Sequence, residues 1–158
     1  MEIPLWQRVI APLVYLLPWS DAIPFGLGMD GVFNQVPLLQ LLIVPAVPFI
    51  QLNRGVPFGG LLLFFVLFLA VVRNPNVPYF LRFNTLQALM TDIVLIVLSF
   101  GFSILLQPLA SGSLLIGTLS STIVIAVLAI LVFALVECLR GREPDLPGIS
   151  QAARMQLY

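Results

Sequence analysis

The feature that most constrains this sequence is the apolar run from Leu114 to Leu139, in which Glu137 is the single charged residue. A helix needs roughly 20 mainly apolar residues to cross a bilayer, and this run exceeds that length. Only 9% of the whole chain is charged, whereas soluble domains carry roughly 25% charged residues. So few charges cannot cover a surface in water. We therefore expect an all-α polytopic membrane protein in contact with the lipid bilayer.

Three further apolar runs bring the predicted number of transmembrane helices to four. The tripeptide 53–55 predicts a turn, and two prolines and two asparagines in residues 73–78 end the preceding helix. The predicted spans cover about residues 36–52, 57–73, 84–106 and 114–139, which together form a transmembrane domain over residues 36–139. A short polar tail follows over residues 140–158.

The N-terminal segment, residues 1–35, is expected to form a helix and a loop outside that domain. Its apolar run is shorter than the roughly 20 residues that a span requires, and it contains Arg8 and Pro12. Amphipathic rings such as those of Trp6, Tyr15 and Trp19 favour the headgroup region. Residues 4–19 are therefore predicted to be an interfacial or re-entrant helix.

The arginines indicate the orientation in the membrane. Positively charged residues near span ends accumulate on the cytoplasmic side. In the predicted topology Arg54 lies alone on one side, and the other six lie opposite: Arg8, Arg73, Arg82, Arg140, Arg142 and Arg154. Both termini are therefore expected on the cytoplasmic side, or on the stromal side of a plastid membrane.

Polar residues gather on one side of the third predicted span. At 100° per residue they share a sector. An unpartnered carboxylate at the position of Asp92 would cost about 2.5–3.5 kcal/mol, so this side chain is expected to face inward. The sector predicts either the lining of a water-filled path or subunit seam, or a satisfied cluster of interhelical hydrogen bonds. Its members are Asn84, Thr85, Gln87, Thr91, Asp92, Ser99 and Ser103.

The fourth span carries a stripe of small residues, which permits close approach of helix backbones. The stripe predicts packing within the monomer or contacts in a homo-oligomer. Its members are Gly117, Thr118, Ser121, Thr122 and Ala126. Near the end of the same helix, Glu137 is expected to pair with Arg140 or Arg142.

The composition argues against most enzymes. The chain has no His, no Lys and one cysteine, Cys138, so the usual metal ligands and acid–base groups are lacking and no cofactor or metal is expected. Asp92 is taken as the sole deep carboxylate, which argues against an aspartyl dyad. A net charge of zero argues against nucleic-acid binding. The prediction is a protein that is not an enzyme.

Several short blocks resemble a known family. They include Val-Val-Arg-Asn, which ends in Arg73 and Asn74, and Arg-Phe-Asn-x-x-Gln-Ala, which begins at Arg82. Tyr-Leu-Leu-Pro at residues 15–18 and Leu-Pro-Gly-Ile-Ser-Gln-Ala at residues 146–152 also match. The chain resembles the Tic-twenty family, the twenty-kilodalton subunit of the translocon at the inner envelope membrane of chloroplasts. Because no Ser- and Arg-rich stretch precedes the first apolar run, it resembles a cyanobacterial or plastid-encoded homologue.

The resemblance implies a four-helix subunit of a preprotein import complex, with both termini on the stromal or cytoplasmic side. It also implies a channel-forming role, with other membrane proteins of a translocon-like complex and a translocating polypeptide as partners. The alternative is a non-catalytic membrane scaffold or assembly factor for other membrane complexes. A small-solute transporter is disfavoured, because the sequence shows no convincing internal repeat.

Overall fold

The computed structural model describes residues 2–28, 31–106 and 114–158, and this part of the chain is helical with no β-strand. An N-terminal rod consists of α1 (Leu5–Ile10), a 3₁₀ segment (Ala11–Tyr15) and α2 (Leu16–Gly26). The remaining elements are α3 (Val32–Gln35), a 3₁₀ segment (Pro37–Ala46), α4 (Val47–Gly55), α5 (Gly59–Leu67), a π segment (Phe68–Val72), α6 (Tyr79–Gly101), a second π segment (Phe102–Leu106), α8 (Leu114–Leu139) and α9 (Ile149–Leu157).

Among the described residues, four helices are long and apolar enough to cross a membrane: Leu5–Gly26, Pro37–Gly55, Tyr79–Leu105 and Leu114–Leu139. The all-α fold and the number of candidate spans agree with the prediction. Two segments differ from it. The N-terminal helix is 22 residues long and reaches the length of a span, whereas the helix Gly59–Val72 at the second predicted span is shorter.

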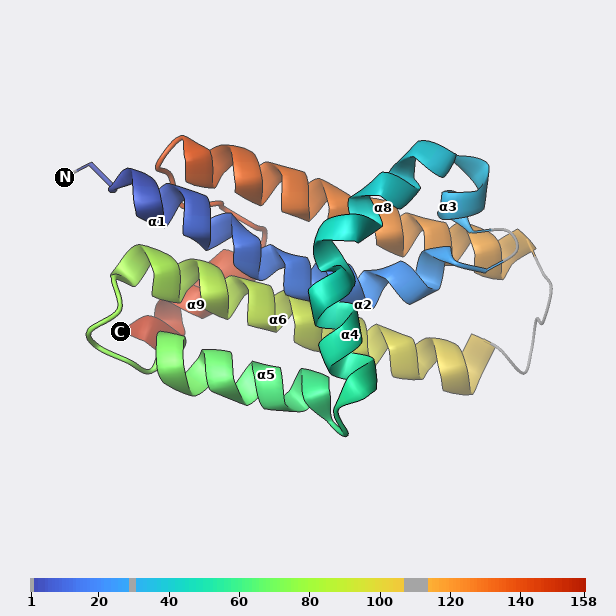
Figure 1. The fold of residues 1–158 in the computed structure, drawn as a ribbon, viewed down its shortest axis with the longest axis horizontal. Coiled ribbons are helices and arrows are strands. Elements are labelled where there is room, and N and C mark those ends of the chain that lie inside the picture. The colour runs from blue at the N-terminus through green and yellow to red at the C-terminus, as the bar shows by residue number, and fades with distance from the viewer. Residues whose placement is uncertain (1, 29–30, 107–113) are drawn as a thin grey trace.

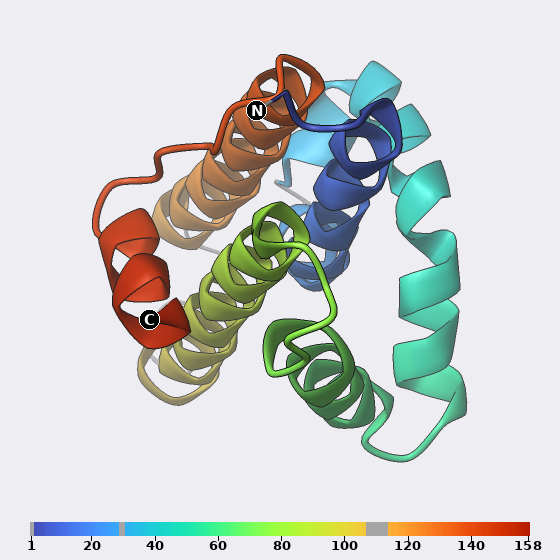
Figure 2. The same ribbon diagram turned by 90° about the vertical axis from the view of Figure 1, so that its left-hand side faces the viewer.

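The N-terminal rod lies at the centre of the bundle. It contacts both α6 and α8, and it lies between these two long helices (Figure 1). The rod, α5, α6 and α8 run side by side along the length of the molecule, whereas Pro37–Gly55 crosses them (Figures 1 and 2). The bundle therefore contains residues 4–19, which were expected at the membrane interface. The first predicted span, residues 36–52, lies across the outside of the bundle.

The residues that argued against a central N-terminal helix are tolerated for local reasons. Pro12 lies at the start of the 3₁₀ segment, where a missing backbone donor is harmless. Arg8 lies near the end of the rod and donates through Nε to the carbonyl oxygen of Ile3 at 2.7 Å. Tyr15 and Trp19 are 1% and 0% exposed, so their rings contact neighbouring helices and not lipid headgroups as the sequence suggested.

The crossing helix Pro37–Gly55 is held at its middle by Trp19, whose indole Nε1 donates to the carbonyl oxygen of Leu42 at 2.8 Å. A tight corner then joins α4 to α5. At Gly59 an added Cβ would lie 2.2 Å from the carbonyl oxygen of Leu52, so this close approach requires glycine. The corner reverses the chain, and α5 runs back along α6.

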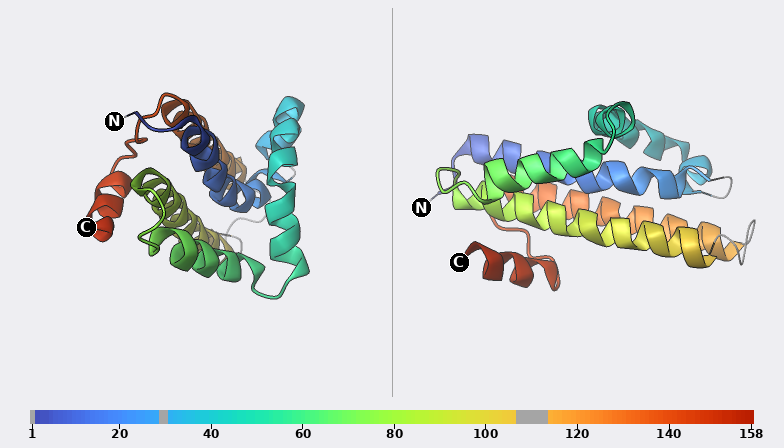
Figure 3. Two further views of the ribbon diagram at one scale, coloured as in Figure 1. Left: turned by 60° about the vertical axis from the view of Figure 1, so that its left-hand side comes forward. Right: turned by 90° about the horizontal axis from the view of Figure 1, so that it is seen from below.

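Both termini lie at the same end of the bundle as the loop before α6, and we call this the terminal end (Figures 1 and 3). The opposite end, where α2 and α6 end and α8 begins, is the distal end. The six arginines predicted to share one side lie in or next to helix ends at the terminal end, while Arg54 lies at the corner between α4 and α5. The shared end of the two termini agrees with the predicted topology.

Candidate functional site

The polar residues of α6 lie on two levels of the bundle. At the terminal end, Asn84 and Gln87 are fully buried and meet the hydroxyl group of Tyr15 from the N-terminal rod. Tyr15 donates to Oε1 of Gln87 at 2.7 Å and approaches Oδ1 of Asn84 at 3.2 Å. The thiol of Cys138 on α8 also donates to Oδ1 of Asn84, at 3.2 Å. One buried polar group therefore joins three helices.

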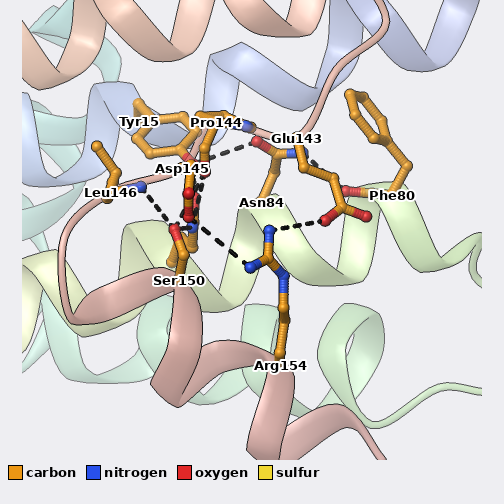
Figure 4. A network of polar contacts seen from close by, with 10 residues as sticks. Tyr15, Phe80, Asn84, Glu143, Pro144, Asp145, Leu146, Ser150 and Arg154 are labelled. Atoms are coloured by element: carbon orange, nitrogen blue, oxygen red, sulfur yellow. Dashed lines mark hydrogen bonds and ion pairs between the residues drawn. The ribbon is translucent and has the colours of Figure 1, made fainter.

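The segment between α8 and α9 completes this polar group (Figure 4). The amide Nε2 of Gln87 donates to the carbonyl oxygen of Pro144 at 3.0 Å and to the hydroxyl oxygen of Ser150. Ser150 also accepts a hydrogen bond from the backbone N–H of Leu146 at 2.6 Å. We call Tyr15, Asn84, Gln87, Cys138 and Ser150 the terminal polar cluster. Its amides are satisfied, as the hydrogen-bond alternative for the polar sector requires.

An arginine fixes α9 against the bundle next to this cluster. Arg154 lies 3.4 Å from an oxygen of Glu143 and 3.8 Å from one of Asp145, and its guanidinium is 5.4 Å from the ring centre of Phe83 (Figure 4). These partly exposed ion pairs contribute little alone. Together with buried Ser150 they place α9 on the flank of α6.

A second polar group lies further along α6, where Asp92 meets Asp21 of α2. Their carboxyl groups lie close enough to interact with each other. Asp92 is 3% exposed, and its Oδ1 is buried without a hydrogen-bond partner among the described residues. Asp92 therefore faces inward as expected. The prediction of a single deep carboxylate is wrong, because α2 continues through Asp21 to Gly26 instead of ending near residue 19.

Asp21 also lines a cavity of about 570 Å³ in the distal half of the bundle. The crossing helix contributes Asn53, whose Nδ2 lies 3.4 Å from Oδ1 of Asp21. Two further sector residues, Ser99 and Ser103, line the same cavity from α6 and its π segment. The other lining residues are Pro24, Phe25, Gly28, Leu95, Ile96, Phe100, Phe102, Ile116 and Ser120.

The predicted polar sector is thus divided between three environments. Asn84 and Gln87 belong to the terminal polar cluster, Asp92 to the acid pair, and Ser99 and Ser103 to the cavity. The remaining members, Thr85 and Thr91, are buried, and the hydroxyl group of Thr91 donates to the carbonyl oxygen of Gln87 at 2.9 Å.

The loop residues 73, 74 and 82 have local contacts. Arg82 donates through Nε to the carbonyl oxygen of Val72 at 2.8 Å, and Oδ1 of Asn74 accepts from the backbone N–H of Asn76 at 3.0 Å. The side chain of Arg73 is exposed. These contacts shape the turn between α5 and α6 at the terminal end.

The small-residue stripe of α8 does not face the bundle. Thr118, Thr122 and Ala126 are exposed and Gly117 and Ser121 half-buried, whereas α8 packs through residues such as Val124 and Ala134. Self-association through the stripe stays a prediction. The expected pairing of Glu137 is confirmed, since Arg140 lies 3.1 Å from its carboxylate.

Sequence reasoning did not place Tyr15, Asp21, Asn53, Cys138 or Ser150 in these polar groups. A signal existed for two of them, because Tyr15 and Ser150 lie in the short blocks at residues 15–18 and 146–152. In the sequence, Asp21 follows the predicted helix over residues 4–19 and Asn53 lies in the predicted turn over residues 53–55, so both were assigned to loops. Their pairing depends on the central position of the N-terminal rod.

Comparison with known proteins gives a consistent result over almost the whole chain. A family model described as "Chloroplast import apparatus Tic20-like" matches residues 2–153. A "Tic20 family protein" of Synechocystis is 35% identical over 96% of this chain and 92% of its own length. "Protein TIC 20-v, chloroplastic" of Arabidopsis thaliana is 34% identical over 96% of this chain and 71% of its own length. A "Tic20 family protein Ycf60" of Gracilaria is 28% identical over 99% of this chain.

Proposed function

Because this chain belongs to the Tic20 family, we propose that it is an integral membrane subunit of a protein translocation complex and contacts the translocating polypeptide through its distal cavity. Its contribution is non-catalytic. The terminal polar cluster holds the bundle together, and the cavity supplies the polar surface that faces the passenger.

The observation that carries this proposal is the set of polar side chains in the cavity wall, which have room for a ligand, unlike the satisfied terminal polar cluster. A polypeptide in transit exposes backbone N–H and C=O groups, each of which costs several kcal/mol in hydrocarbon when it has no partner. The carboxyl group of Asp21, the amide of Asn53 and the hydroxyl groups of Ser99 and Ser103 can bind such groups.

A single copy does not form the whole path. The cavity lies in the distal half, and the terminal polar cluster fills the bundle interior toward the other end with satisfied hydrogen bonds. A channel would therefore form between this chain and other membrane subunits, or between copies of it. The outward-facing small-residue stripe of α8 is the surface that we propose for such a contact.

The arginines support one membrane sidedness. Because the helix ends at the terminal end carry six of them, we propose that the terminal end faces the cytoplasm or stroma. The distal cavity then faces the opposite compartment. We propose a cyanobacterial membrane or a plastid inner envelope as its location.

The alternative function is that of a scaffold that assembles other membrane proteins without touching a passenger. It is favoured by the satisfied hydrogen bonds of the terminal polar cluster, which give Asn84 and Gln87 a structural role. The two functions differ in one respect: the scaffold contacts no polypeptide in transit.

Site-specific photocrosslinking with an arrested precursor tests the proposal. A photoreactive residue placed at Ser99 or Ser103 should form adducts with the precursor. The same residue at Val97 or Ile104, which are 65% and 68% exposed on the outside of the same helix, should form none. Equal adducts at all four positions, or precursor transport without adducts at either serine, would contradict the passenger contact. Recovery of partner subunits in the second case would favour the scaffold.

A further inference from the structure

We propose that Asp21, with Asp92 behind it, is a binding site for one organic cation, the guanidinium or ammonium group of a basic side chain in a polypeptide that enters the distal cavity. In naming the cation's source, this inference rests on the proposed function. It assigns a ligand class to the acid pair.

The acid pair forms no ion pair among the described residues, which include all seven arginines. Arg54 lines a small cavity together with Asp21 but lies outside ion-pair distance. Asp92 is 3% exposed, and its Oδ1 is enclosed without a donor in the described part of the chain. A buried carboxylate without an opposite charge is costly, so retaining one beside a cavity indicates that the charge is used there.

The proximity of the two carboxyl groups bears on the charge of the site. Two ionised carboxylates in close contact repel each other, so the contact between Asp21 and Asp92 favours a pair that keeps one proton. The pair with one shared proton carries one negative charge. It can therefore match a single positive charge without releasing or taking up a proton.

The other cavity residues favour an organic cation. Asn53 holds the Asp21 carboxyl group with a contact of 3.4 Å, so an oxygen of Asp21 is oriented at the wall. Phe25 and Phe102 pack edge to face with ring centres 5.3 Å apart, and Phe100 lies on the same wall. Aromatic rings attract guanidinium and ammonium groups and pack against their aliphatic stems.

A metal ion fits the same place poorly. Calcium and magnesium take six or more oxygen ligands, and the described residues contain no group of three acidic, histidine or cysteine side chains that could hold a metal. A cavity of about 570 Å³ is also large for a single ion but has room for a long side chain. The combination of one net negative charge, three aromatic rings and this volume points to an arginine or lysine side chain.

The test compares two peptides that differ by one non-hydrogen atom and one positive charge. The protein is placed in phosphatidylcholine nanodiscs, whose neutral lipid gives no electrostatic attraction, and titrated against a short fluorescent peptide with one arginine or with citrulline, its neutral isostere. Fluorescence anisotropy reports binding, and empty nanodiscs give the background. We expect the arginine peptide to bind at least about tenfold more tightly than the citrulline peptide, as for a charge-assisted hydrogen bond in a site of low dielectric.

Variants then locate the site. Asp21→Asn should remove most of the preference for arginine over citrulline. Asp145→Asn, the same change at a carboxyl group that is 76% exposed, should leave it intact. Equal binding of the two peptides to the unchanged protein, or a preference that survives Asp21→Asn, would overturn the site. The first comparison uses the unchanged protein, so misfolding of a variant cannot produce it.

The outcomes separate this inference from the proposed function. A preference for arginine together with transport that leaves no precursor adducts would support the cation site and contradict the passenger contact. Precursor adducts at Ser99 or Ser103 together with equal peptide binding would support the passenger contact and contradict the cation site.

Discussion

The hydroxyl group of Tyr15 donates to Oε1 of Gln87 at 2.7 Å across a separation of 72 residues. This hydrogen bond connects the N-terminal rod to α6 in the bundle interior. Gln87 in turn donates to Pro144 and Ser150, so the two ends of the described chain are joined through one side chain.

Replacing Tyr15 by Phe should destabilise the bundle by about 1–3 kcal/mol, because a buried acceptor on Gln87 loses its donor while the volume is almost unchanged. Unfolding in detergent, followed by circular dichroism, measures the change. Thr118→Val is a suitable control, since that exposed hydroxyl bonds to the carbonyl oxygen of Leu114 within its own helix. Equal effects of the two changes would argue against the connection.

Replacing Ser150 by Ala should loosen the segment between α8 and α9. The change removes one of the two acceptors of the Gln87 amide and the acceptor of the Leu146 N–H, a loss of about 1–2 kcal/mol that corresponds to a roughly 5–30-fold larger equilibrium constant for local opening. Hydrogen exchange of residues 143–150 measures this opening equilibrium. Gln151→Ala, the exposed neighbour, should leave it unchanged. Protection that is the same in both variants would show that Ser150 does not hold the segment.

Replacing Gly148 by Ala should also release α9, through the backbone. Gly148 has φ +76°, a conformation that costs residues with a Cβ roughly 1–2 kcal/mol, and no atom lies within 4 Å of the added carbon. The same change at Gly55, which also has open space but no positive φ, isolates the effect of the backbone. Hydrogen exchange of α9 is the measurement. A stronger effect at Gly55 than at Gly148 would contradict the assignment.

Cysteine labelling should show one membrane side for the whole terminal end. Cysteines at Glu2, Asn76 and Arg142, which are exposed, should react with an impermeant maleimide from the cytoplasmic or stromal side. A cysteine at Gly28, near the distal end, should react from the other side. Cys138 is fully buried and should stay unlabelled. Labelling of Glu2 and Arg142 positions from opposite sides would rule out the proposed topology.

The sequence predicted the helical fold and the number of candidate spans because apolar length is a local property. The run 114–139 is recognisable as a span without knowledge of its neighbours. The length and apolar composition of the α6 segment predict a span in the same way. The N-terminal rod was misjudged because Arg8 and Pro12 weaken its local pattern. Arg8 is tolerated because it lies near the end of the rod, and Pro12 because it begins a 3₁₀ segment. Neither property can be read from the local sequence pattern.

The candidate site was predictable only in part, for the same reason. The helical repeat placed Asn84, Gln87 and Asp92 on one side of a helix, and all three are buried. Periodicity within one helix does not reveal which other segments meet it. Tyr15 and Ser150 reach Gln87, and Asp21 reaches Asp92, only because the rod lies between α6 and α8.

The position of Ser150 also affects the order of assembly. Residues 144–150 are synthesised after α8, yet they supply acceptors for Gln87 in the terminal half of α6. Until they emerge from the ribosome, Gln87 must remain hydrated or find a temporary partner. The polar interior near Gln87 can therefore close only after residues 144–150 are available, and a nascent chain stalled before that point would expose unpaired polar groups to insertion factors and quality control.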